Sequence, residues 1–385
     1  METKQHQIIG YDAKRIVCNN TGLGNYSRNL VNALVAADRD TEFRLYTPCE
    51  GRKELRTQIQ VAGNVNFVYP HSMHCRLQRD LWRSGGVVKD LLRDKVNLFH
   101  GLSGELPRGL RKAGIPGIVT IHDLVFLRHP EYYHWIDAKI YARKFRVTCR
   151  EASRIVAISE CTKRDILAFS NFPESRIDVI YQGCGTQFKS VVSGDEKQRV
   201  KTKYGLPEQY ILNVGTIEKR KNVLLAVKAL LKLPKSLSLV IVGKATKYMT
   251  DVQAFITKYQ LTDRIKFMYD VPNEDLPAIY QLASVFVYPS RYEGFGLPII
   301  EGIQSGLPVV ACTGSCLEEA GGPDNIYVDP DDEEGMARGI TRFLEDMSFR
   351  QQSMRQSLNY VRRFEDLDLA NQMLHEYQKL LSVSN

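Results

Sequence analysis

The stretch that decides the fold reads Val285-Phe-Val-Tyr-Pro-Ser-Arg-Tyr-Glu-Gly-Phe-Gly-Leu-Pro-Ile-Ile-Glu-Gly-Ile-Gln-Ser-Gly-Leu-Pro-Val-Val310. Residues 285–288 are β-branched or aromatic and are closed by a proline, which indicates a strand, and a similar run follows at 308–312. Between them, Pro298 suits the start of a helix and Gly306 suits the position just past its end. The stretch therefore predicts strand, loop, helix and strand, the unit from which parallel α/β sheets are built.

The loop 290–297 leaves the carboxyl end of the first strand, where open α/β sheets bind ligands. Gly294 and Gly296 let the loop backbone approach an anion at the helix N-terminus. Glu293 and Glu301 stand eight positions apart on either side of the turn. A pair of carboxylates accepts hydrogen bonds from the hydroxyls of a sugar or a ribose. Each acid alone is also typical of a solvated loop or a helix start, so the combined string is what favours a sugar site.

Length and composition predict two globular domains. The chain has 385 residues, of which 43% are hydrophobic and 25% charged. No apolar run approaches the roughly 18 residues that a membrane span requires, and the N-terminus lacks an apolar signal region. We therefore expect a cytoplasmic protein. The eight cysteines contain no CxxC pair and predict neither disulfides nor a metal site.

The net charge of +8 is confined to the N-terminal half. Residues 1–190 contain 29 Lys and Arg against 19 Asp and Glu, whereas residues 191–385 contain 23 against 25. Such an asymmetry indicates an anionic partner, for example a membrane surface or a lipid diphosphate, or else a basic surface without a partner. We expect peripheral contact with the inner face of a membrane as one possibility and no nucleic-acid partner.

The N-terminal half reads as alternating strands and helices. The turn Gly22-Leu23-Gly24 has part of a dinucleotide fingerprint and precedes a helix at 25–37, so it is either a tight turn or a backbone nest for an anion. Residues 76–93 predict a basic amphipathic helix, interrupted by Gly85 and Gly86, that packs on the core or touches a membrane. His122 and Asp123 directly follow a strand. The predicted strands are 6–11, 43–46, 98–100, 118–121, 154–158 and 177–180.

A second series of strands and helices begins at 210–214. Its first turn, Gly215-Thr216-Ile-Glu-Lys-Arg220-Lys221-Asn222, gathers cations before a helix at 223–233. Such a turn is a diphosphate clamp or a set of solvated lysines. The predicted domains are 1–190 and 198–364, joined by the polar linker 189–197, with a C-terminal helix at 365–385 that is a candidate to pack back on the first domain. The predicted strands are 210–214, 239–242, 265–268, 285–288, 309–312 and 326–328, and the last helices are 333–363 and 367–381.

Five strings together resemble the family-four retaining glycosyltransferases over nearly the whole chain. Arg220-Lys221-Asn222 is similar to the mannosyltransferase-like bacterial branch. The resemblance implies a GT-B fold of the α/β class, in which two Rossmann-like, doubly wound parallel-sheet domains face each other across a cleft and the second holds most of the nucleotide sugar. The strings are Gly22–Tyr26, Thr120–Leu124, Ala157–Lys163, Gly215–Asn222 and Glu293–Glu301.

The resemblance also implies roles for single residues. Glu301 would bind the ribose, Glu293 the hydroxyls of the donor sugar, Arg220 and Lys221 the leaving diphosphate, and His122 would lie beside the donor sugar. Thr216 stands where many members have Arg, so Arg220 is expected to substitute. The donor positions are completed by Gly215, Gly294, Phe295, Gly296 and Leu297, and those facing acceptor and diphosphate are Gly22, Leu23, Gly24 and Asp123.

The implied reaction transfers a hexose from a nucleotide sugar to a hydroxyl of a glycan or a lipid-linked saccharide in surface polysaccharide biosynthesis, such as that of lipopolysaccharide. The branch favours mannose from GDP-mannose, and a UDP-sugar is the alternative donor. Transfer builds negative charge on the diphosphate, which fixed cations stabilise. We therefore expect neither a metal nor another cofactor.

Three other function classes remain as alternatives. A nucleotide-sugar epimerase or a glycan phosphorylase has the same two-domain architecture. An NAD-dependent dehydrogenase is disfavoured because the turn at 22–27 lacks the third glycine and no acid ends the second strand. A non-catalytic binding protein would account for the basic half.

Overall fold

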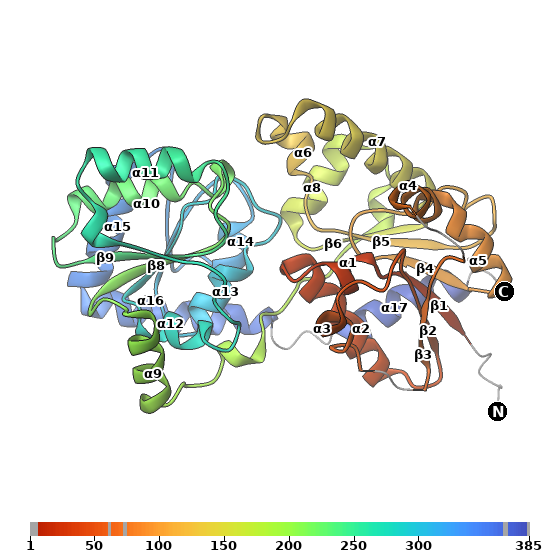
Figure 1. Ribbon diagram of the computed structural model, residues 1–385, viewed down its shortest axis with the longest axis horizontal. Coiled ribbons are helices and arrows are strands. Elements are labelled where there is room, and N and C mark those ends of the chain that lie inside the picture. The colour runs from red at the N-terminus through yellow and green to blue at the C-terminus, as the bar shows by residue number, and fades with distance from the viewer. Residues whose placement is uncertain (1–6, 61–62, 72–74, 365–368, 383–385) are drawn as a thin grey trace. The chain divides into compact units, whose positions relative to one another are not determined.

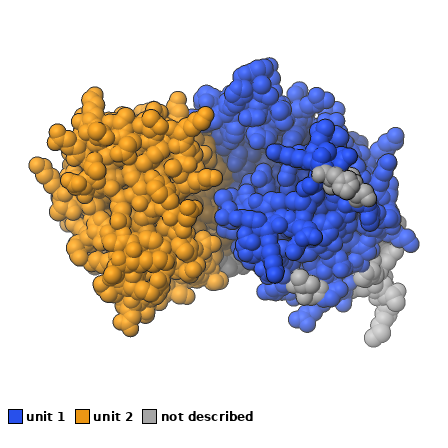
Figure 2. Space-filling view, in the orientation of Figure 1, with its two compact units in different colours: residues 1–182, 367–385 blue, residues 183–366 orange. Residues whose placement is uncertain are grey.

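Two parallel sheets, one in each of two units, organise the computed structural model, which describes residues 7–60, 63–71, 75–364 and 369–382. Unit 1 comprises residues 1–182 and 367–385, and unit 2 comprises residues 183–366 (Figures 1 and 2). Helices pack on both faces of each sheet, so the predicted fold class, two Rossmann-like doubly wound domains, is confirmed. The first unit ends at Gln182 rather than at residue 190.

The sheet of unit 1 has the strand order β3-β2-β1-β4-β5-β6-β7, and all neighbours are parallel. The order reverses between β1 and β4, which leaves a crevice at the carboxyl ends of these two strands. The edge strand β3 was not predicted, because Asn66 interrupts its short apolar run. The strands are β1 Ile8–Asp12, β2 Glu42–Tyr46, β3 Val65–Val68, β4 Leu98–Gly101, β5 Gly117–Ile121, β6 Arg154–Ala157 and β7 Ile177–Val179.

The segment 12–24, between the first predicted strand and the predicted helix 25–37, was expected to be a loop but contains a short helix and the start of the next one. Ile16 and Val17 of α1 are buried in the core and hold that helix in place. Helix α2 begins at Gly22 instead of Asn25. The helices are α1 Lys14–Cys18, α2 Gly22–Ala37, α3 Lys53–Arg56, α4 Arg76–Leu81, α5 Val87–Arg93, α6 Val125–Arg128, α7 Trp135–Glu151 and α8 Glu160–Phe169.

The single helix predicted over 76–93 is interrupted by a π-helical turn at Trp82–Gly86. The extra residue in this turn rotates α4 relative to α5, so the two helices present different faces to the core. Val88 and Leu91 in α5 are buried, whereas Leu77 and Leu81 in α4 are 69% and 61% exposed. The apolar stripe therefore packs on the core only in its second half.

The C-terminal helix α17 (Leu369–Leu381) is part of unit 1 and packs against α2. Met373 and Tyr377 are buried in the core of that unit. The Tyr377 hydroxyl is 2.7 Å from Nδ1 of His100, whose Nε2 is 2.9 Å from Oγ1 of Thr120. Burial lowers the pKa of His100 to about 3, so its ring is neutral. The last helix thus completes a buried polar network beneath β4 and β5.

The sheet of unit 2 has the order β10-β9-β8-β11-β12-β13, also parallel throughout. The strand order reverses between β8 and β11, which again leaves a crevice at their carboxyl ends. All six strands were predicted to within one residue. They are β8 Tyr210–Val214, β9 Ser238–Val242, β10 Ile265–Met268, β11 Val285–Tyr288, β12 Val309–Cys312 and β13 Ile326–Val328.

The predicted linker 189–197 belongs to unit 2 instead. Ser193 caps α9 by accepting a hydrogen bond from the Glu196 amide, and Gln281 bonds the backbone of Ser190 and Val192. The helix predicted over 333–363 is two helices, because Asp346 starts a new one by capping the Phe349 amide. The helices are α9 Gly194–Tyr204, α10 Val223–Ala229, α11 Met249–Lys258, α12 Leu276–Leu282, α13 Leu297–Gln304, α14 Leu317–Gly321, α15 Glu333–Glu345 and α16 Met347–Val361.

The contact between α17 and His100 predicts a stability change in unit 1. Tyr377→Phe removes the hydroxyl and leaves a buried ring nitrogen unpaired, which should lower the free energy of unfolding by about 1–3 kcal/mol. Both tryptophans, Trp82 and Trp135, lie in unit 1, so urea unfolding followed by their fluorescence reports this unit. Tyr141→Phe, at a partly exposed tyrosine of the same unit, is the control. Equal midpoints for the two variants would contradict the prediction.

Candidate active site

Glu293 lies at the centre of a buried polar cluster beyond the ends of β8 and β11. Its Oε2 accepts a hydrogen bond from Nη1 of Arg220 at 2.7 Å. Its Oε1 lies 2.5 Å from Nζ of Lys221 and accepts hydrogen bonds from the hydroxyls of Ser290 at 2.6 Å and Tyr288 at 3.1 Å. Three of these donors meet Oε1 and one meets Oε2. Glu293 is therefore fully engaged by protein groups.

The cluster keeps all three of its buried charges. Burial by itself would raise the pKa of Glu293, but the charges of Lys221 and Arg220 outweigh burial and lower that pKa to about 2. Burial disfavours the ammonium of Lys221 as well, yet Glu293 raises the pKa of Lys221 above its ordinary value, and the same holds for Arg220. The two cations thus share Glu293, and Arg220 also donates from Nη2 to Oε1 of Glu218 at 2.7 Å.

The turn 215–222 is rigid, which fixes the two cations. A Cβ on Gly243 would lie 1.9 Å from the carbonyl oxygen of Gly215, so the backbones after β8 and β9 pack directly on each other. Asn222 adopts a left-handed conformation with φ of 54° and donates a side-chain hydrogen bond to the Pro330 carbonyl at 2.8 Å. The Arg291 amide donates to the Arg220 carbonyl at 2.9 Å. The two loops of the site are therefore joined through their backbones.

Glu301 lies in α13, whose N-terminus is made by Gly296 with φ of 109° and by Pro298 in the first turn. Its Oε2 accepts a hydrogen bond from the Tyr280 hydroxyl of α12 at 3.0 Å. Burial raises the pKa of Glu301 to about 7, more than the bond from Tyr280 lowers it. Phe295 packs edge-on against Phe364 at 5.2 Å. The donor-side loop is thus held by packing, and Glu301 is only partly ionised at neutral pH.

The predicted donor positions therefore gather within unit 2. Gly215 lies next to the side chain of Lys221, since a Cβ at Gly215 would lie 3.7 Å from Cδ of Lys221. Gly294, Phe295 and Gly296 are buried, and Leu297 and Thr216 are partly exposed. Sequence reasoning did not find the partners Tyr280, Tyr288 and Ser290. The sequence shows only that each carries a hydroxyl group: Tyr288 ends a strand, Ser290 follows it and Tyr280 lies in a helix.

In unit 1, His122 follows β5 and is neutral. Its Nε2 donates to the Leu102 carbonyl at 2.9 Å, and its Nδ1 faces the Gln182 amide nitrogen at 3.3 Å. Burial lowers the pKa of His122 to about 4. The ring packs edge-to-face on Tyr26 with 4.7 Å between centroids. His122 is therefore held in one tautomer by its neighbours, with Nδ1 as its acceptor.

Leu23, His122 and Asp123 line one hollow of about 230 Å³ within unit 1. Gly22 and Gly24 form the first turn of α2 rather than a loop before it. At Gly24 a Cβ would lie 1.9 Å from the Asn19 carbonyl oxygen, whereas one at Gly22 would meet no atom within 4 Å. Gly24 is thus required for packing, and Gly22 leaves open space beside the helix end.

Arg28, which sequence reasoning missed, holds this turn together. Its guanidinium donates to the carbonyls of Ile16 and Asn19, both at 2.8 Å, and to the Asn25 side chain at 2.6 Å. The signal was an arginine on the buried face of α2. Arg28 therefore fixes the position of Gly22 and Leu23 relative to β1.

Two features do not occur among the residues that the structure describes. No helix among them is long and apolar enough to cross a membrane. Nor do their His, Cys, Asp and Glu side chains form a group of three suited to a metal ion. A metal-free site stays a prediction.

Comparison with known proteins identifies what the chain is similar to. Residues 20–188 match the family model described as Glycosyltransferase Family 4, and residues 194–359 match the model described as Glycosyl transferases group 1. The O-antigen chain mannosyltransferase B of Escherichia coli is 29% identical over 382 residues, which cover 94% of this chain and 96% of that protein.

Two further likenesses agree with this match. The O-antigen chain mannosyltransferase RfbU of Salmonella typhimurium is 28% identical over 66% of this chain and 67% of its own length. Among solved structures, sucrose-phosphate synthase from Thermosynechococcus elongatus superposes with a TM-score of 0.77 at 20% identity, over 98% of this chain and 100% of that chain. The last likeness concerns the fold alone.

The two acids of the site predict stability changes of opposite sign. On folding, the pKa of Glu301 rises from 4.5 to about 7, so its contribution to stability is full below pH 4.5 and is lost as pH rises through 7. That of Glu293 falls from 4.5 to about 2, so its contribution is present above pH 4.5 and is lost as pH falls through 2. At pH 8, Glu301→Gln should stabilise the protein by about 2 kcal/mol and Glu293→Gln should destabilise it by about 3 kcal/mol.

Calorimetric unfolding of both variants at pH 5 and pH 8 checks this pair. Each substitution replaces one oxygen by NH₂ and leaves the shape unchanged, so each variant is the other's control. At pH 5 the gain from Glu301→Gln should shrink, because the native carboxyl is then mostly protonated. Shifts of the same sign at pH 8 would refute the assigned environments.

Proposed function

Because this chain belongs to the family-four glycosyltransferases, we propose that it transfers mannose from GDP-mannose, with retention of configuration, to a hydroxyl of a saccharide acceptor in O-antigen synthesis. The chain is a hexosyltransferase that uses a nucleotide-sugar donor and a glycan acceptor. Mannose and the O-antigen are taken from the names of the two relatives that match most of their own length. The nucleotide is taken from the family branch that the sequence resembles.

One observation carries the mechanism, namely the pair of buried cations that Glu293 fixes at the crevice of unit 2. When the anomeric C–O bond breaks, positive charge develops on the sugar and negative charge on the departing diphosphate. Arg220 and Lys221 would stabilise the diphosphate without reorganising, because their positions are set before the reaction. These cations supply the charge for which other enzymes use a metal ion, so we propose that no metal is required.

Glu301 is the proposed partner of the nucleotide ribose. It projects from α13, next to the backbone turn 294–296 at the N-terminus of that helix. An ionised carboxylate accepts two hydroxyl hydrogen bonds, which suits a vicinal diol. In unit 1, the neutral His122 offers Nδ1 as an acceptor and is the proposed contact to the donor sugar.

Donor binding and turnover test this proposal. GDP-mannose should raise the melting temperature, because a ligand that binds only the folded state stabilises it, and GDP should be released when a mannoside acceptor is added. Lys221→Met should lower kcat by about 10²–10³-fold with a smaller change in KM. Lys219→Met, at the exposed lysine two positions earlier, is the matched control.

If a UDP-sugar stabilises the protein and GDP-mannose does not, the proposed donor is wrong but the proposed reaction, sugar transfer, stands. Binding of GDP-mannose without transfer to any saccharide would favour a binding protein. Product without acceptor would indicate an epimerase, and a requirement for phosphate would indicate a phosphorylase.

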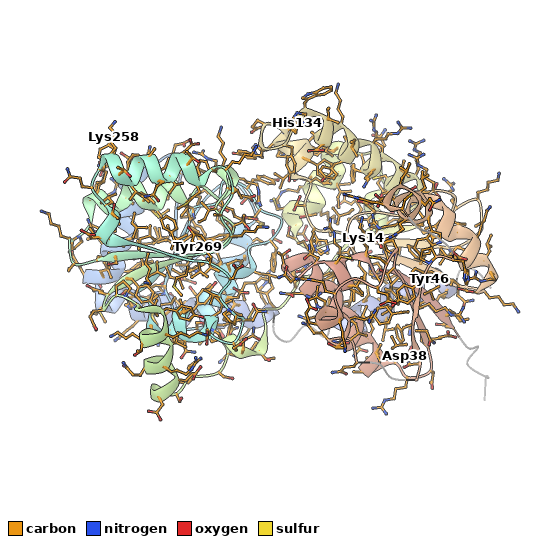
Figure 3. All side chains as sticks on the ribbon, in the orientation of Figure 1. Lys14, Asp38, Tyr46, His134, Lys258 and Tyr269 are labelled. Carbon is orange, nitrogen blue, oxygen red and sulfur yellow. The ribbon has the colours of Figure 1, made fainter. Side chains whose placement is uncertain are left out.

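We also propose that unit 1 contacts an anionic lipid surface. Trp135 is 62% exposed and Ile140 47% exposed on α7, which starts after His134 (Figure 3), and Leu77 and Leu81 are exposed on α4. A helix that presents apolar and basic side chains to solvent binds the interface of anionic bilayers. The basic residues on these two helices are Arg76, Arg79, Lys139, Arg143, Lys144, Arg146 and Arg150.

Sedimentation with vesicles of phosphatidylglycerol and phosphatidylcholine tests this surface. The double variant Trp135→Ser and Ile140→Ser should bind the vesicles about tenfold more weakly than the parent protein. High salt should weaken the binding of the parent protein to the vesicles. Tyr259→Ser is the control, because Lys258 stacks over Tyr259 in unit 2 much as Lys139 stacks over Trp135. Binding that neither salt nor the double variant changes would contradict the proposal.

A further inference from the structure

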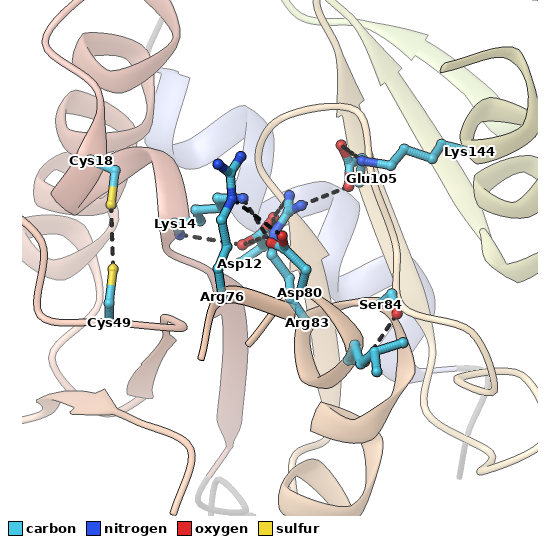
Figure 4. Close-up of polar contacts among 11 residues, drawn as sticks. Asp12, Lys14, Cys18, Cys49, Arg76, Asp80, Arg83, Ser84, Glu105 and Lys144 are labelled. Atoms are coloured by element: carbon cyan, nitrogen blue, oxygen red, sulfur yellow. Dashed lines mark hydrogen bonds and ion pairs between the residues drawn. The ribbon is translucent and has the colours of Figure 1, made fainter. Parts of the chain in front are cut away.

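Two hollows in unit 1 meet at one ion pair (Figure 4). The first hollow has a volume of about 110 Å³ and is lined by Asp12, Arg83 and Arg108 among others. The second is the hollow of about 230 Å³ beside His122. Glu105 and Lys144 line both hollows, with Nζ of Lys144 3.1 Å from Oε1 of Glu105. The hollows are therefore neighbouring compartments separated by these two side chains.

The first hollow occupies the crevice where the strand order of unit 1 reverses. Asp12 is the last residue of β1, and Glu105 follows β4, the strand on the other side of the reversal. Open α/β sheets bind ligands at this position. In unit 2 the equivalent crevice, between β8 and β11, holds the Glu293 cluster. The same rule therefore predicts a ligand in unit 1.

The first hollow presents paired charges that suit a neutral, hydroxyl-rich ligand. Asp12 is only 5% exposed. Its carboxylate accepts hydrogen bonds from Nε of Arg83 at 3.1 Å and from Nη2 of Arg83 at 2.5 Å. Nη1 of Arg83 reaches Oε2 of Glu105 at 2.7 Å. Both carboxylates are paired with Arg83 or Lys144, so these four side chains together carry no net charge. Neighbouring carboxylates and cations offer acceptors and donors to the hydroxyls of a sugar.

The second hollow contains an unpaired hydroxyl and an aromatic wall. Oγ of Ser103 is buried and has no hydrogen-bond partner among the described residues, and buried polar atoms of this kind normally have one. The aromatic wall consists of Phe126, Tyr133 and Tyr141, whose ring centroids lie 5.6–6.5 Å apart. A sugar ring presents hydroxyls at its edge and C–H groups on its faces, so it matches such a mixed wall.

We propose that these two hollows form an acceptor groove with two saccharide subsites. The hollow beside His122 takes the sugar that is extended, and the hollow beside Arg83 takes the sugar before it, so the enzyme recognises a disaccharide end. This inference rests on the proposed transferase function and adds to it the part of the acceptor that is recognised. Arg108 at the rim of the first hollow is exposed and is the residue assigned to the second sugar.

Matched mono- and disaccharide octyl glycosides of mannose, galactose and N-acetylglucosamine test the groove, with kcat/KM and calorimetric binding as readouts. The parent enzyme should prefer the best disaccharide over its monosaccharide by about tenfold, the effect of one charge-assisted hydrogen bond. Arg108→Ala should bring this preference close to one. Arg111→Ala, at an exposed arginine of the same segment that lines neither hollow, should retain it. Glu105→Gln should weaken the use of both acceptors.

The result that overturns the groove is a preference that Arg108→Ala does not change, or equal use of both acceptors by the parent enzyme. If GDP-mannose raises the melting temperature but no glycoside binds, the groove is wrong and the donor site stands. If no nucleotide sugar binds and no transfer occurs, the proposed function itself is wrong. Melting curves of Arg108→Ala and Arg111→Ala separate loss of binding from loss of fold.

Discussion

The proposed donor site of unit 2 depends on the ion cluster of Glu293 with Arg220 and Lys221. Two cations on adjacent residues cannot be buried together without a counter-charge, since each loses its hydration and they repel each other. Glu293 supplies that charge from the facing loop and also accepts hydrogen bonds from Ser290 and Tyr288, while Glu218 pairs with Arg220 from the other side. A cation held by a carboxylate is fixed in place before any ligand arrives. The cluster therefore explains how the side chains of this site hold two cations in fixed positions.

Both units place their polar residues by the same topological means. In each sheet the strand order reverses once, between β1 and β4 in unit 1 and between β8 and β11 in unit 2. At the reversal the connections leave on opposite faces, so no helix covers the carboxyl ends of the two strands. Asp12 and Glu293 both lie at such a point and both pair with arginine. The fold thus creates two crevices, and the side chains at each one determine which ligand it suits.

The sequence predicted the strands of unit 2 closely because each is a short β-branched run closed by glycine, proline or a polar turn. It also located the cations and acids of the donor site, since a turn such as 215–222 is local. It failed where a tertiary contact decides the structure. Helix α1 is held by Ile16 and Val17, which reach the core, and the π-helical turn contains Arg83, which pairs with Asp12. The partners Tyr288 and Tyr280 were invisible because one lies on a strand and the other on a helix with no local signal for a site.

Glu293 and Glu301 show how environment separates two identical groups in one loop and helix. Glu293 meets two cations and stays ionised, whereas Glu301 meets a tyrosine hydroxyl, and burial raises its pKa to about 7. Near neutral pH about half of Glu301 is then protonated. A diol that donates two hydrogen bonds favours the ionised form and lowers the pKa again. Nucleotide binding at Glu301, where we propose it, would therefore be coupled to the release of a proton, while the charge of Glu293 stays constant and keeps the cations in position.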